Sequence, residues 1–273
     1  MTNEKIGIGI VTCNRNEFFD NLLKSLFVRG GRDKIDYIVG VNDGEPFDYQ
    51  NTLHGCFFDD FIDNKTNLGV GKSKNILFRK LLEQQCDHIF IIEDDMVIKD
   101  VTVFEKYIEA SKTSGLKHLL YGYHGPANKV NNKPMPLFTV PYPNDIKIAY
   151  NTHCVGSFCY YHKSVLEDVG IFDENYTNAW EHVDHSYNIV KAGYLPGYWY
   201  WPDLANSMDY IGEQACSENN STIRPREDWR TNIIYGAHHF KEKHNYLPVE
   251  VPTEGRQVIY EKIKIIKEKH GQN

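Results

Sequence analysis

Three consecutive carboxylates, Glu93-Asp94-Asp95, follow a short and mostly apolar stretch, residues 88–92. At the end of a buried strand, such a run repels itself unless a cation compensates the charge. Carboxylate oxygens suit Mg²⁺ or Mn²⁺, and these ions commonly complete their coordination shells with substrate phosphates. The run therefore predicts a divalent metal site, and an acidic, solvated turn is the plain alternative.

A glycine-containing segment, residues 66–73, could approach a phosphate. It ends in Gly71-Lys72-Ser73, but the phosphate-binding P-loop pattern needs a glycine where this chain has Thr66. Without that pattern, Gly69 and Gly71 still allow a tight turn whose following helix N-terminus can receive a diphosphate or a sugar. The alternatives are an ATPase, which would combine this segment with the acidic strand end, and an ordinary loop-to-helix junction.

A third group of candidate residues, with acidic and imidazole side chains, lies between Trp180 and His185. On a helix, Glu181 shares one face with Asp184 and with His185, so the group could remove a proton from an alcohol. Trp180 suits the apolar face of a sugar ring, although a core position is equally common for tryptophan. A polar helix face is the structural alternative, and the spacing of His182 and His185 is only weak support for zinc.

Alternating strands and helices are predicted to position these groups. The apolar runs predict strands at 6–11, 35–41, 57–62, 88–92 and 155–162, and helices at 17–27, 71–85, 180–193 and 258–270. Strand–helix alternation implies a mostly parallel α/β sheet, whose ligands bind at the carboxyl ends of the strands. Asp43 and the 93–95 acids fall at such ends. Five prolines in residues 124–147 predict a long loop or hairpin.

Composition narrows the class of protein. The 273 residues carry 30 Lys and Arg against 37 Asp and Glu, a net charge of −7, which argues against a nucleic-acid partner held by phosphate contacts. No apolar stretch is long enough for a transmembrane segment or a signal peptide, so we expect a cytoplasmic protein. Peripheral membrane association and the oligomeric state stay open. Six scattered cysteines lack metal-binding spacing and are expected to be small buried side chains without disulfides.

Five segments occur in the order found in GT-A glycosyltransferases, and the chain most resembles their inverting family 2. The segments are TCNRNE ending at residue 17, VNDG at 41–44, NLGVGKSKN at 67–75, IIEDDM at 91–96 and AWEHVDHSYNIVKAGY at 179–194. Residues 156–176 are similar to the strand and helix that precede the catalytic acid motif of that family. The resemblance covers about residues 5–205. It implies a Rossmann-like, mostly parallel central sheet flanked by helices, with an irregular acceptor-side half.

The resemblance also implies roles for individual residues. The nucleotide and donor sugar are expected to contact Thr12, Asn14, Arg15, Asp43, Asn67, Gly71, Lys72 and Asp94. Glu93 and Asp95 match the outer acids of the DxD motif, with Asp95 the better direct ligand for Mn²⁺ or Mg²⁺. Asp43 matches the acid that receives the nucleobase or ribose.

One departure from the family concerns the catalytic base. Family 2 usually has Glu-Asp where this chain has Glu181-His182. Histidine is a competent base near neutral pH, so Glu181, His182 and Asp184 all remain candidates. The swap also leaves open a non-catalytic module that binds nucleotide sugars or glycans. Some relatives add a histidine as a metal ligand from beyond this helix, for which His238 and His239 are the candidates.

The resulting prediction is a metal-dependent transferase that moves a sugar from a nucleotide-diphosphate sugar, most simply a UDP-sugar, to a hydroxyl acceptor with inversion, in glycan or polysaccharide synthesis. We expect one domain over residues 1–273. Residues 1–120 would form the nucleotide-sugar half, and residues 121–273 the acceptor half with its C-terminal helical tail. Aromatic side chains expected to stack on sugars are Trp180, Tyr194, Tyr198, Trp199 and Trp201.

Overall fold

A six-stranded sheet runs through the computed structural model, which describes residues 4–28, 30–46, 57–214 and 221–272. The strand order is β3-β2-β1-β4-β11-β6. The strands are β1 (Ile6–Thr12), β2 (Tyr37–Asn42), β3 (Asp60–Asp63), β4 (His88–Glu93), β6 (His118–Leu120) and β11 (Phe158–His162). β1 to β4 pair in parallel, and β11 is antiparallel to both β4 and β6. The predicted α/β class and mostly parallel sheet are confirmed.

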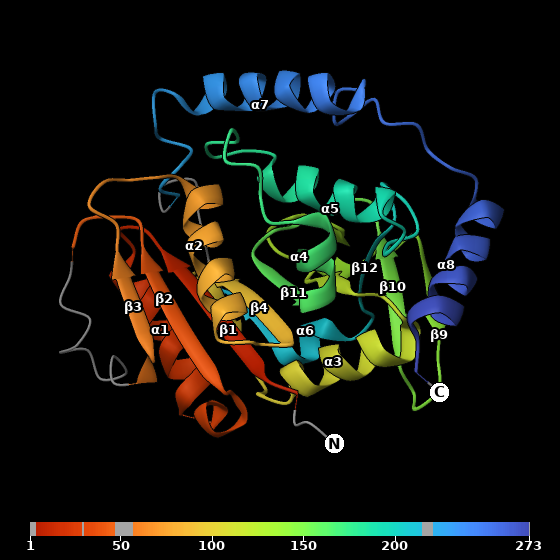
Figure 1. The fold of residues 1–273 in the computed structure, drawn as a ribbon, viewed down its shortest axis with the longest axis horizontal. Coiled ribbons are helices and arrows are strands. Elements are labelled where there is room, and N and C mark those ends of the chain that lie inside the picture. The colour runs from red at the N-terminus through yellow and green to blue at the C-terminus, as the bar shows by residue number, and fades with distance from the viewer. Residues whose placement is uncertain (1–3, 29, 47–56, 215–220, 273) are drawn as a thin grey trace.

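Small residues in β1 bring a helix close to the sheet. Gly7 and Gly9 face α2 (Val70–Glu83), and a Cβ atom on Gly9 would lie 2.9 Å from the Cβ atom of Leu77. The alternate residues Ile8 and Ile10 are fully buried. Helix α1 (Asn16–Phe27) lies on the other face of the sheet (Figure 1). The sheet therefore has both faces covered, as a mostly parallel sheet requires.

The second half of the chain returns to the same sheet. β11 inserts between β4 and β6, so the two predicted halves share one set of backbone hydrogen bonds. The organisation as one domain stays a prediction. A smaller sheet has the order β12-β10-β9, with β9 (Phe138–Pro141), β10 (Lys147–Asn151) and β12 (Trp201–Leu204). The proline-rich segment contains the predicted hairpin, β7 (Lys129–Val130) with β8 (Lys133–Pro134).

A short antiparallel strand pair lies directly after the Glu93-Asp94-Asp95 acids. β5 (Met96–Ile98) follows Asp95 directly and pairs antiparallel with β13 (Ile211–Glu213), so that Glu213 is opposite Met96. Two short helical turns connect longer elements: η1 (Gly31–Lys34) precedes β2, and α6 (Ser207–Tyr210) precedes β13. The pairing places Glu213 close to the carboxylates although about 120 residues separate them along the chain.

The remaining helices surround the sheets. They are α3 (Val103–Ser114), α4 (Lys163–Val169), α5 (Glu181–Lys191), α7 (Trp229–His244) and α8 (Arg256–His270). The helices expected at 180–193 and 258–270 are confirmed as α5 and α8. The helices α3 and α7 were not predicted from the sequence. Figure 1 shows α7 lying across one end of the molecule, above α5, and α8 at the side near the C-terminus.

Two further expectations concern cysteines and membranes. Cys13, Cys86, Cys154 and Cys159 are free thiols, of which Cys86 and Cys159 are buried, and Cys56 and Cys216 lie outside the described residues. Among the described residues, no helix combines the length and the apolar character needed to cross a bilayer.

Candidate functional site

Three neighbouring cavities lie at the carboxyl ends of the parallel strands, and Thr222 lines all of them. Their volumes are about 60, 530 and 180 Å³. We call them together the strand-end cleft. The predicted residues that line it are Thr12, Asn14, Arg15, Asp43, Asn67, Glu93, Asp94 and Asp95. Segments far apart in the sequence therefore meet where an α/β sheet is expected to bind its ligand.

Arg15 joins two of the three acids. Its guanidinium contacts both carboxylate oxygens of Asp94, and its Nη1 atom lies 3.2 Å from Asp95 Oδ2. The Thr12 hydroxyl donates to Asp94 Oδ2 at 2.7 Å. Burial raises the pKa of Asp94 to about 7, although Arg15 and Thr12 favour its charged form. Asp94 therefore anchors the loop that follows β1, and its predicted contact with the donor stays a prediction.

Glu93 has a partner that the sequence analysis missed. The fully buried Lys74 donates to Glu93 Oε1 at 2.5 Å and to the carbonyl of Gly156 at 2.9 Å. Burial disfavours the charged form of Glu93, but Lys74 outweighs it, and the net pKa of Glu93 is lowered. The periodicity of α2 indicates only that Lys74 lies on a helix. Its partners, Glu93 on β4 and Gly156 in the loop before β11, are distant in the sequence.

Asp95 is the least satisfied of the three acids. Its side chain is 6% exposed, and Oδ1 has no hydrogen-bond partner. Burial and the charge of Glu93 raise the pKa of Asp95, against the opposing effect of His124 and Arg15. Its Oδ2 atom lies 3.8 Å from His124 Nε2. An unpaired buried carboxylate oxygen is costly, so this position is suited to a further cation.

Asp43 holds the loop that leads into α2. Its carboxylate accepts hydrogen bonds from Asn64 Nδ2 at 2.8 Å, from Leu68 N at 2.7 Å and from Gly69 N at 2.9 Å. Asn67 Nδ2 donates to the carbonyl of Asp43 at 2.7 Å. Only one of these donors contacts Oδ2, so that oxygen can still accept a hydrogen bond from a ligand.

The glycines of the α2 loop act through backbone geometry. Gly69 has φ of +88°, and a Cβ atom there would lie 2.3 Å from the carbonyl oxygen of Thr177. Gly71 lies against the carbonyl of Tyr176 and the side chain of Glu181. The structure does not bring Gly71 or Lys72 into the cleft lining, and Lys72 is exposed on α2. Gly71 has a structural role in this packing, and the contact of Gly71 and Lys72 with the donor stays a prediction.

A histidine–carboxylate pair lies at the start of α5, and neither Glu181 nor His182 is among the residues that line the strand-end cleft. His182 Nδ1 lies 3.1 Å from Glu181 Oε1. Because an ionised carboxylate only accepts, Nδ1 carries the proton and Nε2 is left as an acceptor. Burial opposes the charged form of Glu181, yet His182 and Lys74 outweigh it and lower the pKa of Glu181 to about 2. The His182 ring packs on Gly156, the residue whose carbonyl binds Lys74, so the pair is linked to the acidic strand end.

Asp184 lies apart from this pair, which corrects the prediction of a three-member base cluster. Its side chain is 1% exposed and accepts from His244 Nε2 at 2.7 Å, from Lys243 Nζ at 2.8 Å and from the Tyr176 hydroxyl at 3.0 Å. All of these partners belong to α7 or to the segment before α5. Asp184 therefore attaches α7 to the body of the protein.

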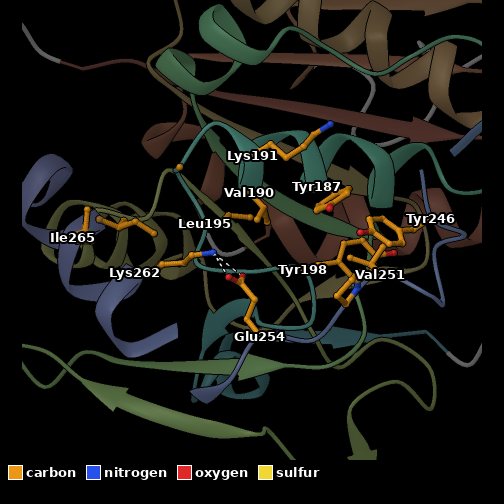
Figure 2. A pocket seen from close by; sticks show the side chains of 13 residues that line it. Tyr187, Val190, Lys191, Leu195, Tyr198, Tyr246, Val251, Glu254, Lys262 and Ile265 are labelled. Atoms are coloured by element: carbon orange, nitrogen blue, oxygen red, sulfur yellow. Dashed lines mark hydrogen bonds and ion pairs between the residues drawn. The ribbon is translucent and has the colours of Figure 1, made fainter. Parts of the chain in front are cut away.

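The aromatic residues proposed for the acceptor do not line the cleft. Trp180 donates from Nε1 to the carbonyl of Ile233 on α7, and Trp199 donates to that of Val251. Tyr198 is buried and lines a separate cavity of about 540 Å³ beside α5 and α8. Figure 2 shows Tyr187, Tyr198 and Tyr246 at one side of that cavity, near the Lys262–Glu254 ion pair. These contacts indicate that the aromatic side chains pack within the protein rather than stack on a sugar.

The two C-terminal histidines proposed as metal ligands are elsewhere. His239 Nε2 donates to Asp173 Oδ2 at 2.9 Å, and the His239 ring packs against Tyr176. His238 is exposed on α7. Neither lines the cleft, so that assignment is corrected: His239 packs α7 against the body, and His238 lies on the exposed side of α7.

The donor set can be tested against a divalent metal. In the described part of the chain no group of three or more His, Cys, Asp or Glu side chains is arranged to hold an ion. The unpartnered Oδ1 of Asp95 nevertheless fits a metal that completes its shell with substrate phosphates, as Mg²⁺ commonly does. Glu93 fits less well, because its Oε1 atom already binds Lys74.

No family model matches the chain. An uncharacterised glycosyltransferase of Acanthamoeba polyphaga mimivirus, R363, is 23% identical over 234 residues, which are 80% of this chain and 85% of that protein. Among solved structures, residues 1–349 of S. aureus TarS superpose with a TM-score of 0.52 at 16% identity, over 77% of this chain and 60% of that one. The chain thus spans about three fifths of this TarS fragment.

Two further structures have the same fold at low identity. The second structure is GalNAc-T7, solved with UDP, GalNAc and Mn²⁺, with a TM-score of 0.55 and 12% identity over 98% of this chain and 58% of that one. The third is a Drosophila β-1,4-galactosyltransferase 7, with a TM-score of 0.50 and 12% identity over 82% and 76%. These glycosyltransferases share the mostly parallel sheet described above. The chain has the GT-A fold of glycosyltransferases.

Proposed function

We propose that the protein transfers a sugar from a nucleotide-diphosphate sugar, with UDP as the nucleotide, to a hydroxyl acceptor. One observation carries the proposal: the strand-end cleft gathers Thr12, Arg15, Asp43 and Asp95 at the edge where a GT-A fold binds its donor. The name of the mimivirus relative, and the UDP and UDP-GlcNAc bound in two TarS structures, support the same activity.

The charges of the cleft suit a diphosphate donor. Mn²⁺ or Mg²⁺, held by Asp95, would supply positive charge against the departing diphosphate. Arg15 keeps Asp94 and the β1 loop in place beside that position. Asp43 Oδ2 has room to accept the N–H of a pyrimidine or a ribose hydroxyl.

His182 is the base in this proposal, with Glu181 as its positioning residue. Glu181 holds the proton on Nδ1, so that Nε2 can take the proton of the acceptor hydroxyl. The deprotonated oxygen then attacks the anomeric carbon from the face opposite the diphosphate, which inverts that centre. Glu181 itself is buried with a pKa near 2, so it is a weak base.

Nucleotide binding is the first test. Calorimetric titration of the full chain with UDP and ADP, each with and without Mn²⁺, should give tighter binding of UDP by about one to two decades, because a mismatched base leaves a buried acceptor unpaired at about 1–3 kcal/mol. The second test is turnover of UDP-sugars in Mn²⁺, compared with the Asp95→Asn variant and with added EDTA.

Each outcome assigns the chain to a class. UDP binding with metal-dependent turnover supports the transferase. Specific UDP-sugar binding without any turnover, even with a panel of acceptors, indicates a non-catalytic binding module instead. Preference for ATP, with hydrolysis that needs Lys72, would mean that the ATPase interpretation is correct.

A further inference from the structure

We propose that His124 is a second protein ligand of the divalent cation beside Asp95, and that Glu213 positions it. This inference deepens the proposed function and rests on it. His124 lies in the segment that follows β6, and neither the sequence analysis nor the motifs drew attention to it. Its two ring nitrogens face two carboxylates: Nε2 lies 3.8 Å from Asp95 Oδ2, and Nδ1 lies 3.2 Å from Glu213 Oε2.

The distance between His124 and Asp95 suits a shared ion. A separation of 3.8 Å is too long for a hydrogen bond. Neighbouring ligands of an octahedral ion at about 2.1 Å lie about 3.0 Å apart, so His124 Nε2 and Asp95 would approach by about 0.8 Å when an ion binds between them. Both residues line the cavity of about 530 Å³, and Asp95 Oδ1 is buried there without a hydrogen-bond partner. The Arg15 contact engages only Oδ2.

Glu213 is held in a fixed position behind the imidazole. Lys129 Nζ donates to its Oε1 atom at 2.8 Å, and the backbone N–H of Gly125 donates to Oε2. The β5–β13 pairing places Glu213 opposite Met96, one residue after Asp95. A metal-binding histidine usually donates its other N–H to a carboxylate, which fixes the tautomer and the direction of the ring. Glu213, His124 and Asp95 have this order in space, and His124 Nδ1 lies 3.2 Å from Glu213 Oε2 without the alignment of a hydrogen bond, so a small rotation of the ring would complete the arrangement.

Two protein ligands leave the remaining coordination positions to the diphosphate and water. This agrees with the absence of a three-residue metal group among the described residues, and with the preference of small divalent ions for one or two protein ligands plus phosphates. We therefore expect weak Mn²⁺ binding alone and tight binding together with UDP. The competing interpretation is that His124 is a permanent cation that neutralises Asp95 and Glu213 without any metal.

The test measures Mn²⁺ binding rather than turnover. Free Mn²⁺ is followed by electron paramagnetic resonance in titrations of the full chain with and without UDP. We expect His124→Ala to weaken Mn²⁺ binding in the presence of UDP at least tenfold, and Glu213→Gln to weaken it about 10–100-fold. Exposed His238→Ala is the matched control and should bind like the wild type. UDP binding without metal should be unchanged in all three variants.

A second measurement does not depend on how the variants fold. In the wild-type complex with Mn²⁺ and UDP, electron spin-echo spectra should show a ¹⁴N coupling that changes when the protein is labelled with ¹⁵N-histidine. Absence of this coupling, or wild-type Mn²⁺ affinity in a folded His124→Ala variant, overturns the inference about His124. If Asp95→Asn also keeps full Mn²⁺ affinity, or if the wild type binds no Mn²⁺ with UDP, the proposed metal site itself is wrong.

Discussion

His182 and Glu181 have different roles in the proposed proton transfer. The ring of His182 is 25% exposed, while Glu181 is buried and contacts Nδ1. A buried carboxylate with a lowered pKa holds its charge and orients its neighbour, whereas the accessible imidazole can accept a proton. Sequence alignment alone leaves this division undecided, because both residue types can act as bases.

Replacement of His182 should therefore remove the chemical step. We expect His182→Ala to lower kcat by about 10²–10⁴ while the affinity for the donor is retained. Asp184→Asn is the control on the same helix, because Asp184 faces α7, and it should keep the chemical step. Stopped turnover assays and UDP titrations measure both quantities. Near-normal kcat in His182→Ala would move the base to another residue.

Lys74, on helix α2, is a second residue whose role depends on partners distant in the sequence. It is fully buried between Glu93 and the carbonyl of Gly156, and its charge also lowers the pKa of Glu181. Removing one member of a buried ion pair leaves an uncompensated charge, at a cost of about 3–5 kcal/mol. We expect Lys74→Met to lose about that much stability in urea unfolding.

The paired substitution separates charge from packing. Lys74→Met combined with Glu93→Gln removes both charges, so the double variant should recover part of the lost stability. A double variant that is as unstable as the sum of the two single variants would show that the ion pair contributes no coupling. The exposed neighbour Lys72 provides the control, and Lys72→Met should change stability by less than about 0.5 kcal/mol.

At the scale of elements, α7 is attached to the body mainly through α5. Asp184 accepts from Lys243 and His244, and Trp180 donates to the carbonyl of Ile233. Much of the rest of α7 is exposed, including Ile234 and Tyr235. The stability of this helix therefore depends on a few buried polar contacts rather than on a broad apolar face.

Asp184→Asn should loosen α7 locally. The amide cannot compensate the charge of Lys243, so amide hydrogens of α7 should exchange at least tenfold faster, which corresponds to about 1.4 kcal/mol of local stability. Amides of the central strand β4 should change little. Lys241→Ala, at an exposed position on α7, is the matched control. Equal protection in wild type and Asp184→Asn would contradict this role for Asp184.

Strong periodicity explains which elements could be predicted. The apolar runs of β1 and β4 and the amphipathic α5 and α8 are visible in the sequence, because each buries one face or both. Helix α7 has little amphipathic pattern, since polar contacts hold it, and the sequence analysis missed it. The same distinction holds for the site residues. Arg15 and Asp95 were predicted from the sequence to share the cleft. Lys74, His124 and Glu213 become functional candidates only through contacts between segments distant in the sequence.

At the scale of the whole molecule, buried acids fall into two groups. Burial raises the pKa of Asp94 and of Asp203 to about 7, and burial together with Glu93 raises that of Asp95. For Glu181 and Glu213, burial acts in the same direction, but hydrogen bonds and nearby cations outweigh it and lower each pKa to about 2. The two groups make opposite contributions to the dependence of stability on pH.

For the buried acids alone, the protein without ligands should accordingly be most stable near pH 4.5. Burial lowers the pKa of His118 to about 3 and those of His162 and His185 to about 4, so these three histidines add stability that is lost as the pH falls below about 6.5. A group with a raised pKa in the folded state stabilises fully below its unfolded value of about 4 and loses that contribution as the pH rises through about 7. A group with a lowered pKa stabilises above about 4.5 and loses its contribution as the pH falls toward 2. The urea midpoint, measured from pH 3 to pH 9 with a constant dependence on urea concentration, should therefore decrease on both the acidic and the alkaline side of the maximum.

Asp95→Asn removes one of the groups with a raised pKa and also the repulsion from Glu93. This variant should therefore be more stable than the wild type at pH 8, with a shallower decline of stability on the alkaline side. An alkaline decline that is equally steep in Asp95→Asn and in the wild type would contradict the raised pKa of Asp95.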